Sequence, residues 1–598
     1  MNQNNQSIYL FSFIVLLGLC LIQLKKSKDF PEITESEIMS HIRYLSHENR
    51  GGRYPGTKGS KDVIAYLVKE FKSYGIKPGL NKSFVQPFDI TTDLEIDKSS
   101  FVTLNNDTLK LNNEYTPLPF SSDGNAKGAL VFVGYGFNIN EEELKWNDYK
   151  NIDVKDKWAV IMRHGPNRDE KHSKYTNHMP LHKKMLVARD MGAIGVAFIS
   201  QVEDENLLPF NYMPGYKNEG IPAIHFSNEF ADKILKQEGW SRKRIQEEMN
   251  QKLNSINFEI DNQKLATKIK INKLKIRAGN VVGEIRSGNR KYRDEYVVIG
   301  AHFDHLGLGG LGSGSRKPND VLIHPGANDN ASGTAGLLEI AQKLSTQKGR
   351  LKRSVLLIGF DAEEKGLLGA KHFIKNPPVD LDKIITMINM DMIGGMKDSN
   401  VIIGGVGTSP SFEPLLDSLK KSRNIKISMN KPGFGPSDHA AFYSENIPVL
   451  FFFSGFDNEY HTPNDTWKNI NLRGTENIVS LVYDVVFHVN RISSPPIFTK
   501  SGPKQTQTSA PKRFNVTLGI MPSYGSVEAG LEVDAISKVD GPAATAGIKP
   551  GDIITSINSK GINDIYEYMD RLGELKPGMT VPVIIVREGK ELVFRISF

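Results

Sequence analysis

The feature that most constrains the fold is a set of apolar segments in the second half of the chain, most of which end at an acidic residue or a histidine. A helical pattern at 331–344 separates the first two of these segments, and we expect the segments to be strands at 295–301, 354–360, 384–390 and 447–453. Near-continuous apolar strands that alternate with helices are typical of a sheet whose two faces are both covered. We therefore predict an α/β domain built on such a sheet.

The polar residues at these strand ends are expected to lie close together. In open α/β sheets the ligand site lies just beyond the carboxyl ends of the strands, and here the strands lead into HFDH at 302, DAEE at 361, MD at 390 and YH at 460. Histidines and carboxylates without cysteine form a ligand set that suits zinc, or less often manganese or cobalt. Two metals about 3.5–4 Å apart need a bridging carboxylate and terminal ligands on both sides, and this many polar residues can supply them.

Five motifs of this region occur in an order that resembles the co-catalytic zinc exopeptidases, a family that includes bacterial leucyl-type aminopeptidases, glutamate carboxypeptidase and the transferrin receptor. The motifs are HFD at 302–304, GANDNASG at 326–333, DAEEKGLLG at 361–369, NMDMIG at 389–394 and YHTPNDT at 460–466. The resemblance implies a three-layer αβα peptidase domain with a mixed, mostly parallel sheet. We expect this domain to occupy residues 29–93 and 273–492.

The resemblance also implies a ligand set for two Zn²⁺ ions. Asp329 would bridge the metals, Glu364 and His461 would complete one site, and His302 and Asp391 would complete the other. The scheme gives no ligand role to the other histidines nearby, which are His305, His324 and His372.

Further residues receive roles from the same resemblance. Asp304 would orient His302, and Glu363 would be the general base that takes a proton from the attacking water and delivers it to the leaving amine. Tyr460 would stabilise the oxyanion, but a tyrosine beside a ligand is as often a packing residue. His439 is a candidate substrate contact, because GPSDHAAF around it resembles a family loop near the substrate pocket.

The activity implied by the resemblance is the release of N-terminal residues from peptides. The alternative is a carboxypeptidase of the glutamate type or a dipeptidase, but a carboxypeptidase would need basic side chains for the substrate carboxylate, and no arginine cluster lies near the motifs. A non-catalytic peptide-binding protein should have lost ligands, and all five are present. A glutaminyl cyclase uses one zinc, and the glutamate pair at 363 and 364 favours the hydrolase.

An inserted domain is expected at residues 94–272, where short β-like runs surround one helix. VFVGYGFN at 131–138 and the helix before AIGVAFIS resemble the protease-associated domain that several members of this family carry. Its implied role is control of substrate access or selection, with a passive lid as the alternative.

A PDZ domain is expected at residues 514–598, after a proline-rich and polar linker at 493–513. The resemblance rests on LGI at 518 and on DGPAATAGIKPGDIITSINSKGI at 540. PDZ domains bind a peptide C-terminus by strand addition, so backbone N–H groups around Gly519 would hold its carboxylate. Packing on the catalytic domain is the alternative role.

The N-terminal residues 1–28 are predicted to be a signal peptide or membrane anchor, because the apolar run Ile8–Leu24 has the length of a signal-peptide core. We therefore expect an exported protein, periplasmic, envelope-bound or secreted, that meets the membrane only through this segment. Cys20 lies in a stretch that resembles a lipoprotein signal, so lipidation is a further possibility. The lysines at 25, 26 and 28, taken as a positive-inside signal, would indicate the opposite orientation.

Composition excludes some other functions. The net charge of +7 arises from 75 Lys and Arg against 68 Asp and Glu. These basic residues are scattered and lack the interleaved aromatic residues of a nucleic-acid groove, so we expect peptide partners and no nucleic acid. Cys20 is the only cysteine, so no intrachain disulfide can form.

Overall fold

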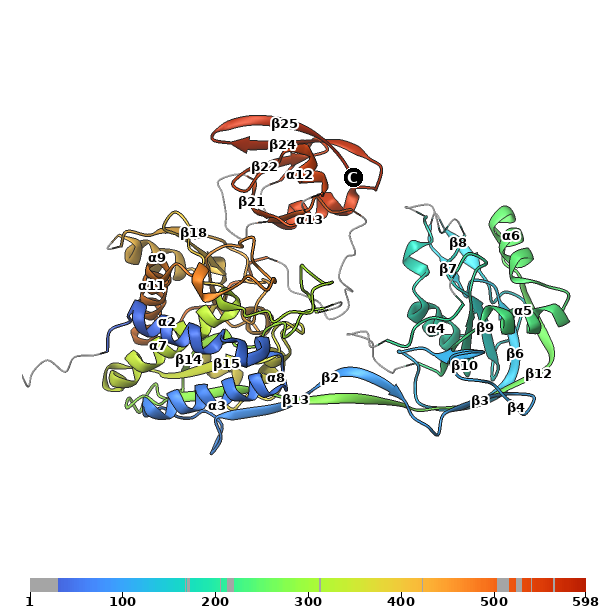
Figure 1. The fold of residues 1–598 in the computed structure, drawn as a ribbon, viewed down its shortest axis with the longest axis horizontal. Coiled ribbons are helices and arrows are strands. Elements are labelled where there is room, and N and C mark those ends of the chain that lie inside the picture. The colour runs from blue at the N-terminus through green and yellow to red at the C-terminus, as the bar shows by residue number, and fades with distance from the viewer. Residues whose placement is uncertain are drawn as a thin grey trace, which may run out of the picture. The chain divides into compact units, whose positions relative to one another are not determined.

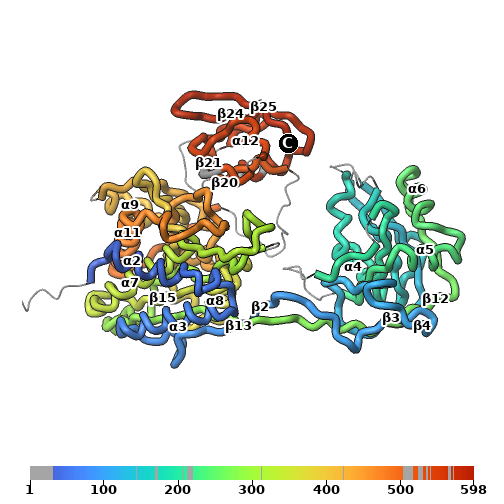
Figure 2. Tube along the Cα trace, viewed as in Figure 1, coloured from blue at the N-terminus to red at the C-terminus, as the bar shows by residue number. Residues whose placement is uncertain are grey.

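The computed structural model describes residues 31–598 apart from 143, 167, 169–172, 205, 212–219, 311–312, 422, 503–515, 523–529, 539 and 563–564. The chain divides into two compact units, one formed by the segment up to Phe88 together with Arg277–Phe598, and the other by Asp89–Ile276 (Figures 1 and 2). No helix within the described ranges is long and apolar enough to cross a membrane. The apolar run at 8–24 and Cys20 lie outside these ranges.

A nine-stranded mixed sheet forms the centre of the first unit, in the order β1-β13-β15-β14-β16-β19-β17-β18, with β2 paired to β13. Its central strands run parallel to one another and are buried along their whole length. Burial on both faces explains their nearly continuous apolar sequences. These strands are β14 Tyr296–His302, β15 Ser354–Phe360, β16 Ile384–Met390 and β19 Val449–Phe453.

The outer strands of this sheet include antiparallel pairs, β13 with β15 and β17 with β19. Sequence analysis identified neither β13 nor β17. The first half of β13 is largely exposed and charged, and β17 is only five residues long. The outer strands are β1 Lys77–Pro78, β2 Val85–Ile96, β13 Ile271–Ile285, β17 Asn400–Gly404 and β18 Lys426–Met429.

Helices cover both faces of the sheet, so the predicted αβα fold is confirmed. One face shares a core with α2, α3, α7, α9 and α11, and α2, α7 and α11 contact one another (Figure 1). The other face packs on α8 and α10. The helices are α2 Glu35–Leu45, α3 Lys58–Ser73, α7 Gly333–Thr346, α8 Leu368–Lys375, α9 Phe412–Lys420, α10 His439–Ser444 and α11 Leu472–Arg491.

The second unit has its own eight-stranded sheet, in the order β4-β3-β12-β6-β9-β10-β11-β5. Its boundaries, at 89 and 276, fall inside β2 and β13, a few residues outside the predicted 94–272, because both strands continue from one unit into the other. Its elements are β3 Phe101–Leu104, β4 Asp107–Thr108, β5 Tyr115–Pro117, β6 Gly124–Val133, β7 Asn138–Asn140, β8 Lys145–Asn147, β9 Trp158–Met162, α4 Leu181–Asp190, β10 Gly195–Ile199, β11 Ala223–Phe226, α5 Asn228–Gln237, α6 Arg242–Lys252 and β12 Asn257–Ile269.

The C-terminal part of the chain has an antiparallel sheet in the order β20-β21-β22-β24-β25 with a core of its own. Gly519 precedes its edge strand and has φ +80°, a conformation that favours glycine. The elements are β20 Ile520–Pro522, β21 Leu531–Ile536, α12 Pro542–Ala546, β22 Ile553–Ile557, β23 Lys560–Gly561, α13 Ile565–Glu574, β24 Thr580–Arg587 and β25 Lys590–Ser597.

Candidate active site

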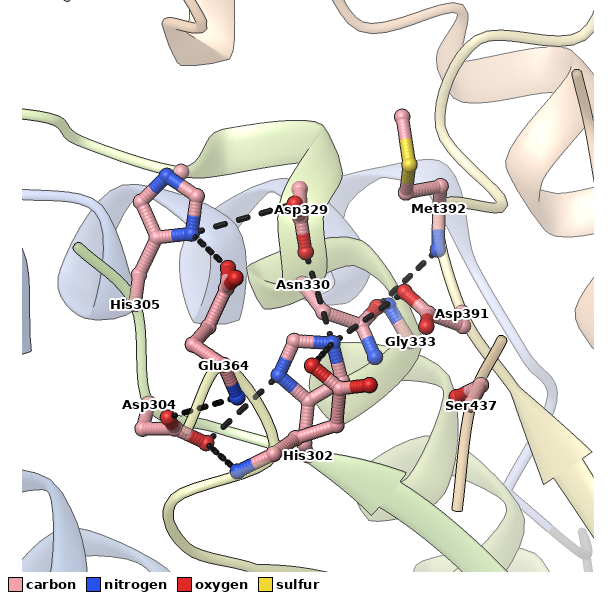
Figure 3. Close-up of polar contacts among 12 residues, drawn as sticks. His302, Asp304, His305, Asp329, Asn330, Gly333, Glu364, Asp391, Met392 and Ser437 are labelled. Carbon is pink, nitrogen blue, oxygen red and sulfur yellow. Dashed lines mark hydrogen bonds and ion pairs between the residues drawn. The ribbon is translucent and has the colours of Figure 1, made fainter. Parts of the chain in front are cut away.

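The five predicted ligand residues lie together beyond the carboxyl ends of the central strands, and Figure 3 shows four of them, His302, Asp329, Glu364 and Asp391. His302 is the last residue of β14, Asp391 directly follows β16, and Glu364 lies four residues after β15. Asp329 is in the turn Ala327–Ser332 that opens α7. The parallel pairing of β14 with β15 and β16 therefore explains why residues distant in sequence share one site.

Asp329 lies between two groups of ligand-type side chains. Its Oδ1 is 3.3 Å from His302 Nε2, which is itself 3.2 Å from Asp391 Oδ1. Its Oδ2 is 3.1 Å from His461 Nε2, which is 3.2 Å from Glu364 Oε2. Each Asp329 oxygen thus faces a different group, which is the arrangement of a bridging carboxylate.

His305, which sequence analysis left outside the ligand scheme, also belongs to this constellation. It is fully buried, and its Nδ1 lies 2.7 Å from Glu364 Oε1 and 3.9 Å from Asp329 Oδ2. Its contact uses the Glu364 oxygen that does not face His461. The sequence signal was its position directly after HFD, one residue beyond the end of the motif.

Asp304 connects the histidine of one strand to the glutamates of the next. Its Oδ1 is 3.6 Å from His302 Nδ1, and its two oxygens accept hydrogen bonds from the backbone N–H groups of Glu363 (2.9 Å) and Glu364 (3.3 Å). The Glu363 side chain takes a different direction from that of Glu364, with Oε2 4.0 Å from His302 Nε2. Asp304 therefore holds the backbone of both glutamates, and its predicted role in orienting the His302 imidazole stays a prediction.

The electrostatics of the site show that it attracts positive charge. Burial alone would lower the pKa of His302, but Asp391 and Glu363 outweigh burial and hold this pKa well above its usual value. Glu364 and Asp329 raise the pKa of His461 in the same way. Burial raises the pKa of Glu363. Divalent cations would replace the protons on these imidazoles, so the side chains fit a metal centre in charge as well as in donor type.

Two buried ionisable residues bind the backbone of the loops of the site, and these roles were not predicted. Asp465 accepts hydrogen bonds from the backbone N–H groups of Asn328 (2.8 Å) and Asp329 (3.0 Å). The Arg53 guanidinium donates to the backbone oxygens of Phe303 (2.7 Å), Leu45 (3.0 Å), Pro325 (2.5 Å) and Gly326 (2.9 Å). Burial lowers the pKa of Arg53 to about 10, so it stays charged at neutral pH.

Arg53 reaches this position through the glycine-rich loop before α3. A side chain at Gly52, which has φ +69°, would meet the backbone oxygen of Gly307 at 2.3 Å. The Gly307 N–H donates to Gly52 O (3.0 Å). The close approach of these two backbones explains the glycine at position 52.

Of the other two predicted residues, Tyr460 lies beside this constellation and His439 packs on β19. The Tyr460 ring stacks on His461, with centroids 3.8 Å apart, and burial raises its pKa well above the usual value. His439 is 1% exposed and stacks on Phe451 at 4.4 Å. Their proposed contacts with the oxyanion and with substrate stay predictions.

Comparison with known proteins identifies two of the domains. Residues 280–486 match Peptidase family M28, and residues 525–598 match the PDZ domain. Leucine aminopeptidase 2 of Trichophyton equinum is 26% identical over 253 residues, which cover 37% of this chain and 47% of that protein. An aminopeptidase of Pseudomonas aeruginosa strain UCBPP-PA14 is 32% identical over 186 residues, covering 29% of this chain and 31% of that protein.

The chain thus spans about half the length of the leucine aminopeptidase it matches. A solved structure of BSAP, a zinc aminopeptidase from Bacillus subtilis, has 20% sequence identity and a TM-score of 0.41, and covers 79% of this chain and 99% of that one. All five predicted ligands lie within residues 280–486. The chain therefore carries a peptidase family M28 domain, which contains the candidate site, followed by a PDZ domain.

Proposed function

We propose that this protein is a two-zinc aminopeptidase. The observation that carries the proposal is the position of Asp329, whose two carboxylate oxygens face two separate groups of ligand-type side chains. His302 and Asp391 would hold one Zn²⁺, and Glu364 and His461 the other. Nitrogen and oxygen donors without cysteine suit zinc, and the M28 match supports the same assignment.

The proposed reaction is hydrolysis of the first peptide bond. When bound, the zinc ions would polarise the scissile carbonyl and lower the pKa of the attacking water. Glu363 accepts the proton of that water and returns it to the leaving amine, since its carboxylate lies beside the ligands without belonging to either group. Asp304 holds the Glu363 backbone in place for this transfer. Tyr460, beside His461, would donate to the developing oxyanion.

Release from the N-terminus is favoured over release from the C-terminus. One arginine, Arg53, acts electrostatically on Asp329, Asp304 and Glu364. However, it is fully buried and donates to backbone oxygens, so it does not offer its guanidinium to a substrate carboxylate. The matched relatives are also named aminopeptidases.

An apolar cluster adjoins the site and supports a preference for apolar first residues. Met392, which directly follows Asp391, packs with Phe451 and Phe453, and Phe456 and Tyr460 border the same cluster. Figure 3 shows Met392 next to Asp391. A leucine-like side chain placed against this cluster would gain free energy from burial of apolar surface.

The proposed activity is tested with substrates blocked at one end. We expect purified protein to cleave leucyl p-nitroanilide and C-terminally amidated peptides, and to leave N-acetylated ones intact. Aspartyl p-nitroanilide should be cleaved at least about ten-fold more slowly, since an apolar cluster does not solvate a carboxylate. A chelator should abolish activity and added zinc restore it, with two zinc ions per active chain. Release of C-terminal residues alone would contradict the proposal.

The role of His305 gives a second test. Because its Nδ1 contacts the Glu364 oxygen that faces away from His461, we expect His305→Ala to weaken zinc binding by about 10–100-fold, as loss of a residue that orients a ligand does. His305→Asn should retain more affinity, since its amide can occupy the place of Nδ1. Competition with a chromogenic chelator measures this affinity. His324→Ala is the control, because His324 bonds to Leu322 O and Ser315 Oγ; an equal loss there would contradict the assignment.

We further propose roles for the remaining parts of the chain. Strand β20 lies at the edge of its sheet and follows Gly519, which supports binding of a peptide C-terminus by strand addition. The second unit is proposed to be a protease-associated domain that controls substrate access, since it interrupts the peptidase domain between β2 and β13. The apolar run at 8–24 supports action outside the cytoplasm, with or without lipidation of Cys20.

A further inference from the structure

A basic groove of about 530 Å³ lies where β14 and β15 begin. Three segments distant in sequence form it: the turn after β13, the turn between α7 and β15, and the end of α11. Its lining contains three cations, and the lining residues at 288, 289, 349 and 351 are neutral. The three cations are Arg350, Lys352 and Arg491.

The two arginines of the groove both make cation–π contacts with the Phe487 ring. The guanidinium carbons of Arg350 and Arg491 lie 5.0 and 4.9 Å from the centre of the Phe487 ring. Both arginines are exposed. Lys352 Nζ donates to the backbone oxygen of Ile492 (2.9 Å). The fold therefore collects three positive charges on one surface and leaves the arginines in contact with solvent.

Two acidic residues that follow β13 are paired with cations outside the groove lining. Asp294 and Glu295, which follow β13, form ion pairs with Arg286 (2.7 Å) and Arg353 (2.5 Å), neither of which lines the groove. Their negative charge is compensated within the fold. The lining of the groove thus carries three cationic side chains, and the planar guanidinium groups of its two arginines suit the bidentate binding of phosphate.

The groove and the metal site lie at opposite ends of the same strands. β14 and β15 are parallel strands of seven residues, which separates their two ends by roughly 20 Å at about 3.3 Å per residue. The groove adjoins the first residues of these strands, and the predicted metal ligands follow their last ones. A surface bound at the groove therefore leaves the metal site facing away from it.

A chain of contacts connects the groove to the beginning of the described chain. Glu32 Oε2 lies 2.8 Å from Lys343 Nζ, which is 4.9 Å from the centre of the Tyr483 ring. Tyr483 stacks on Phe487 at 5.8 Å, the ring that holds both groove arginines. Glu32 is thus linked to the Phe487 ring through three successive side-chain contacts, and seven residues lie between it and the end of the apolar run at Leu24. The eight Cα–Cα steps from residue 24 to residue 32 span at most roughly 29 Å when extended.

We propose that the basic groove binds the lipid phosphates of an anionic membrane surface while the N-terminal apolar run is inserted in that membrane. The short connection between the apolar run and residue 32 restricts which face of the domain can approach the bilayer. The face near residue 32 carries Arg350, Lys352 and Arg491. Each basic residue near an anionic surface strengthens attraction about five-fold. The metal site then opens toward soluble peptides. This proposal is independent of the proposed activity, because it concerns the opposite end of the domain.

The experiment uses the full-length protein inserted in vesicles of phosphatidylcholine, alone or mixed with phosphatidylglycerol. Hydrogen exchange of backbone amides at 286–293 and 348–352 is measured in both. We expect exchange at least about five-fold slower on the anionic vesicles, with the difference lost in high salt, which screens exposed charges. Equal exchange on the two vesicle types would overturn the proposal. So would equal slowing by inorganic phosphate on neutral vesicles, which would indicate a site for a small free anion.

A charge-reversal variant tests the assigned residues. Arg350→Glu/Arg491→Glu should lose the slowing by anionic lipid, whereas Lys61→Glu/Lys420→Glu, with the same change of charge on exposed positions of α3 and α9, should keep it. Exchange in β16, at 384–390, reports whether each variant is folded. An equal loss in both variants would show that net charge alone is responsible and would contradict the proposal. If the first variant fails to fold, the lipid and salt comparisons on the unaltered protein still decide.

Discussion

Glu363→Gln is expected to lower kcat by about 10²–10⁴-fold, the usual contribution of a general base, while zinc stays bound. The substitution keeps the shape of the side chain and removes its ability to accept the proton of the attacking water. The Glu363 carboxylate lies 4.0 Å from His302 Nε2, and the close ligand-type contacts are made by Asp391, Asp329 and Glu364 instead. Steady-state kinetics on leucyl p-nitroanilide, combined with the zinc content of the dialysed variant, measure both quantities.

The adjacent glutamate supplies the matched control for this test. Glu364→Gln changes the same group one residue further along the chain, but its carboxylate contacts His461 Nε2 (3.2 Å) and His305 Nδ1 (2.7 Å). We therefore expect this variant to lose zinc affinity first, and to recover part of its activity in excess zinc. If instead Glu363→Gln loses zinc and Glu364→Gln keeps it, the two roles assigned here are exchanged.

The strands that could be predicted from the sequence are those buried on both faces, because burial requires apolar residues at nearly every position. β15 and β16 begin and end at the predicted residues, because strands covered on both faces are apolar nearly throughout. β13 and β17 lack this signal. β13 carries exposed residues as it passes between the two units, and β17 is a short strand paired antiparallel with β19.

The candidate site likewise contains residues that the sequence pattern predicts and residues that it does not. The convergence of His302, Glu364 and Asp391 was predicted because each lies at or just after the end of an apolar strand, and the family resemblance assigned them as ligands. Arg53 and Asp465 leave no such pattern, since they act on backbone groups of loops that are distant in sequence. The contact of Arg53 with the Phe303 carbonyl spans 250 residues, and no local spacing in the chain indicates it.

Arg53→Met provides the second large effect that we expect, and it separates stability from metal binding. Removing a buried charge that donates to several backbone oxygens should lower the free energy of unfolding by about 3–5 kcal/mol, because these oxygens lose their partner. The oxygens of Phe303 and Gly326 belong to the segments that carry His302 and Asp329. Zinc affinity of the folded variant should therefore fall as well. Urea unfolding and chelator competition measure the two effects.

Arg353 offers a control for this prediction, because it is an equally buried arginine at the opposite end of the sheet. It donates to the backbone oxygens of Asn490 (3.2 Å) and Ile492 (2.8 Å) and pairs with Glu295. Arg353→Met should cost comparable stability and leave zinc affinity of the folded protein unchanged. Equal losses of zinc affinity in the two variants would mean that Arg53 acts only through global stability. A loss confined to Arg53→Met, and reduced in Arg53→Lys, would identify it as the residue that positions the loops of the metal site.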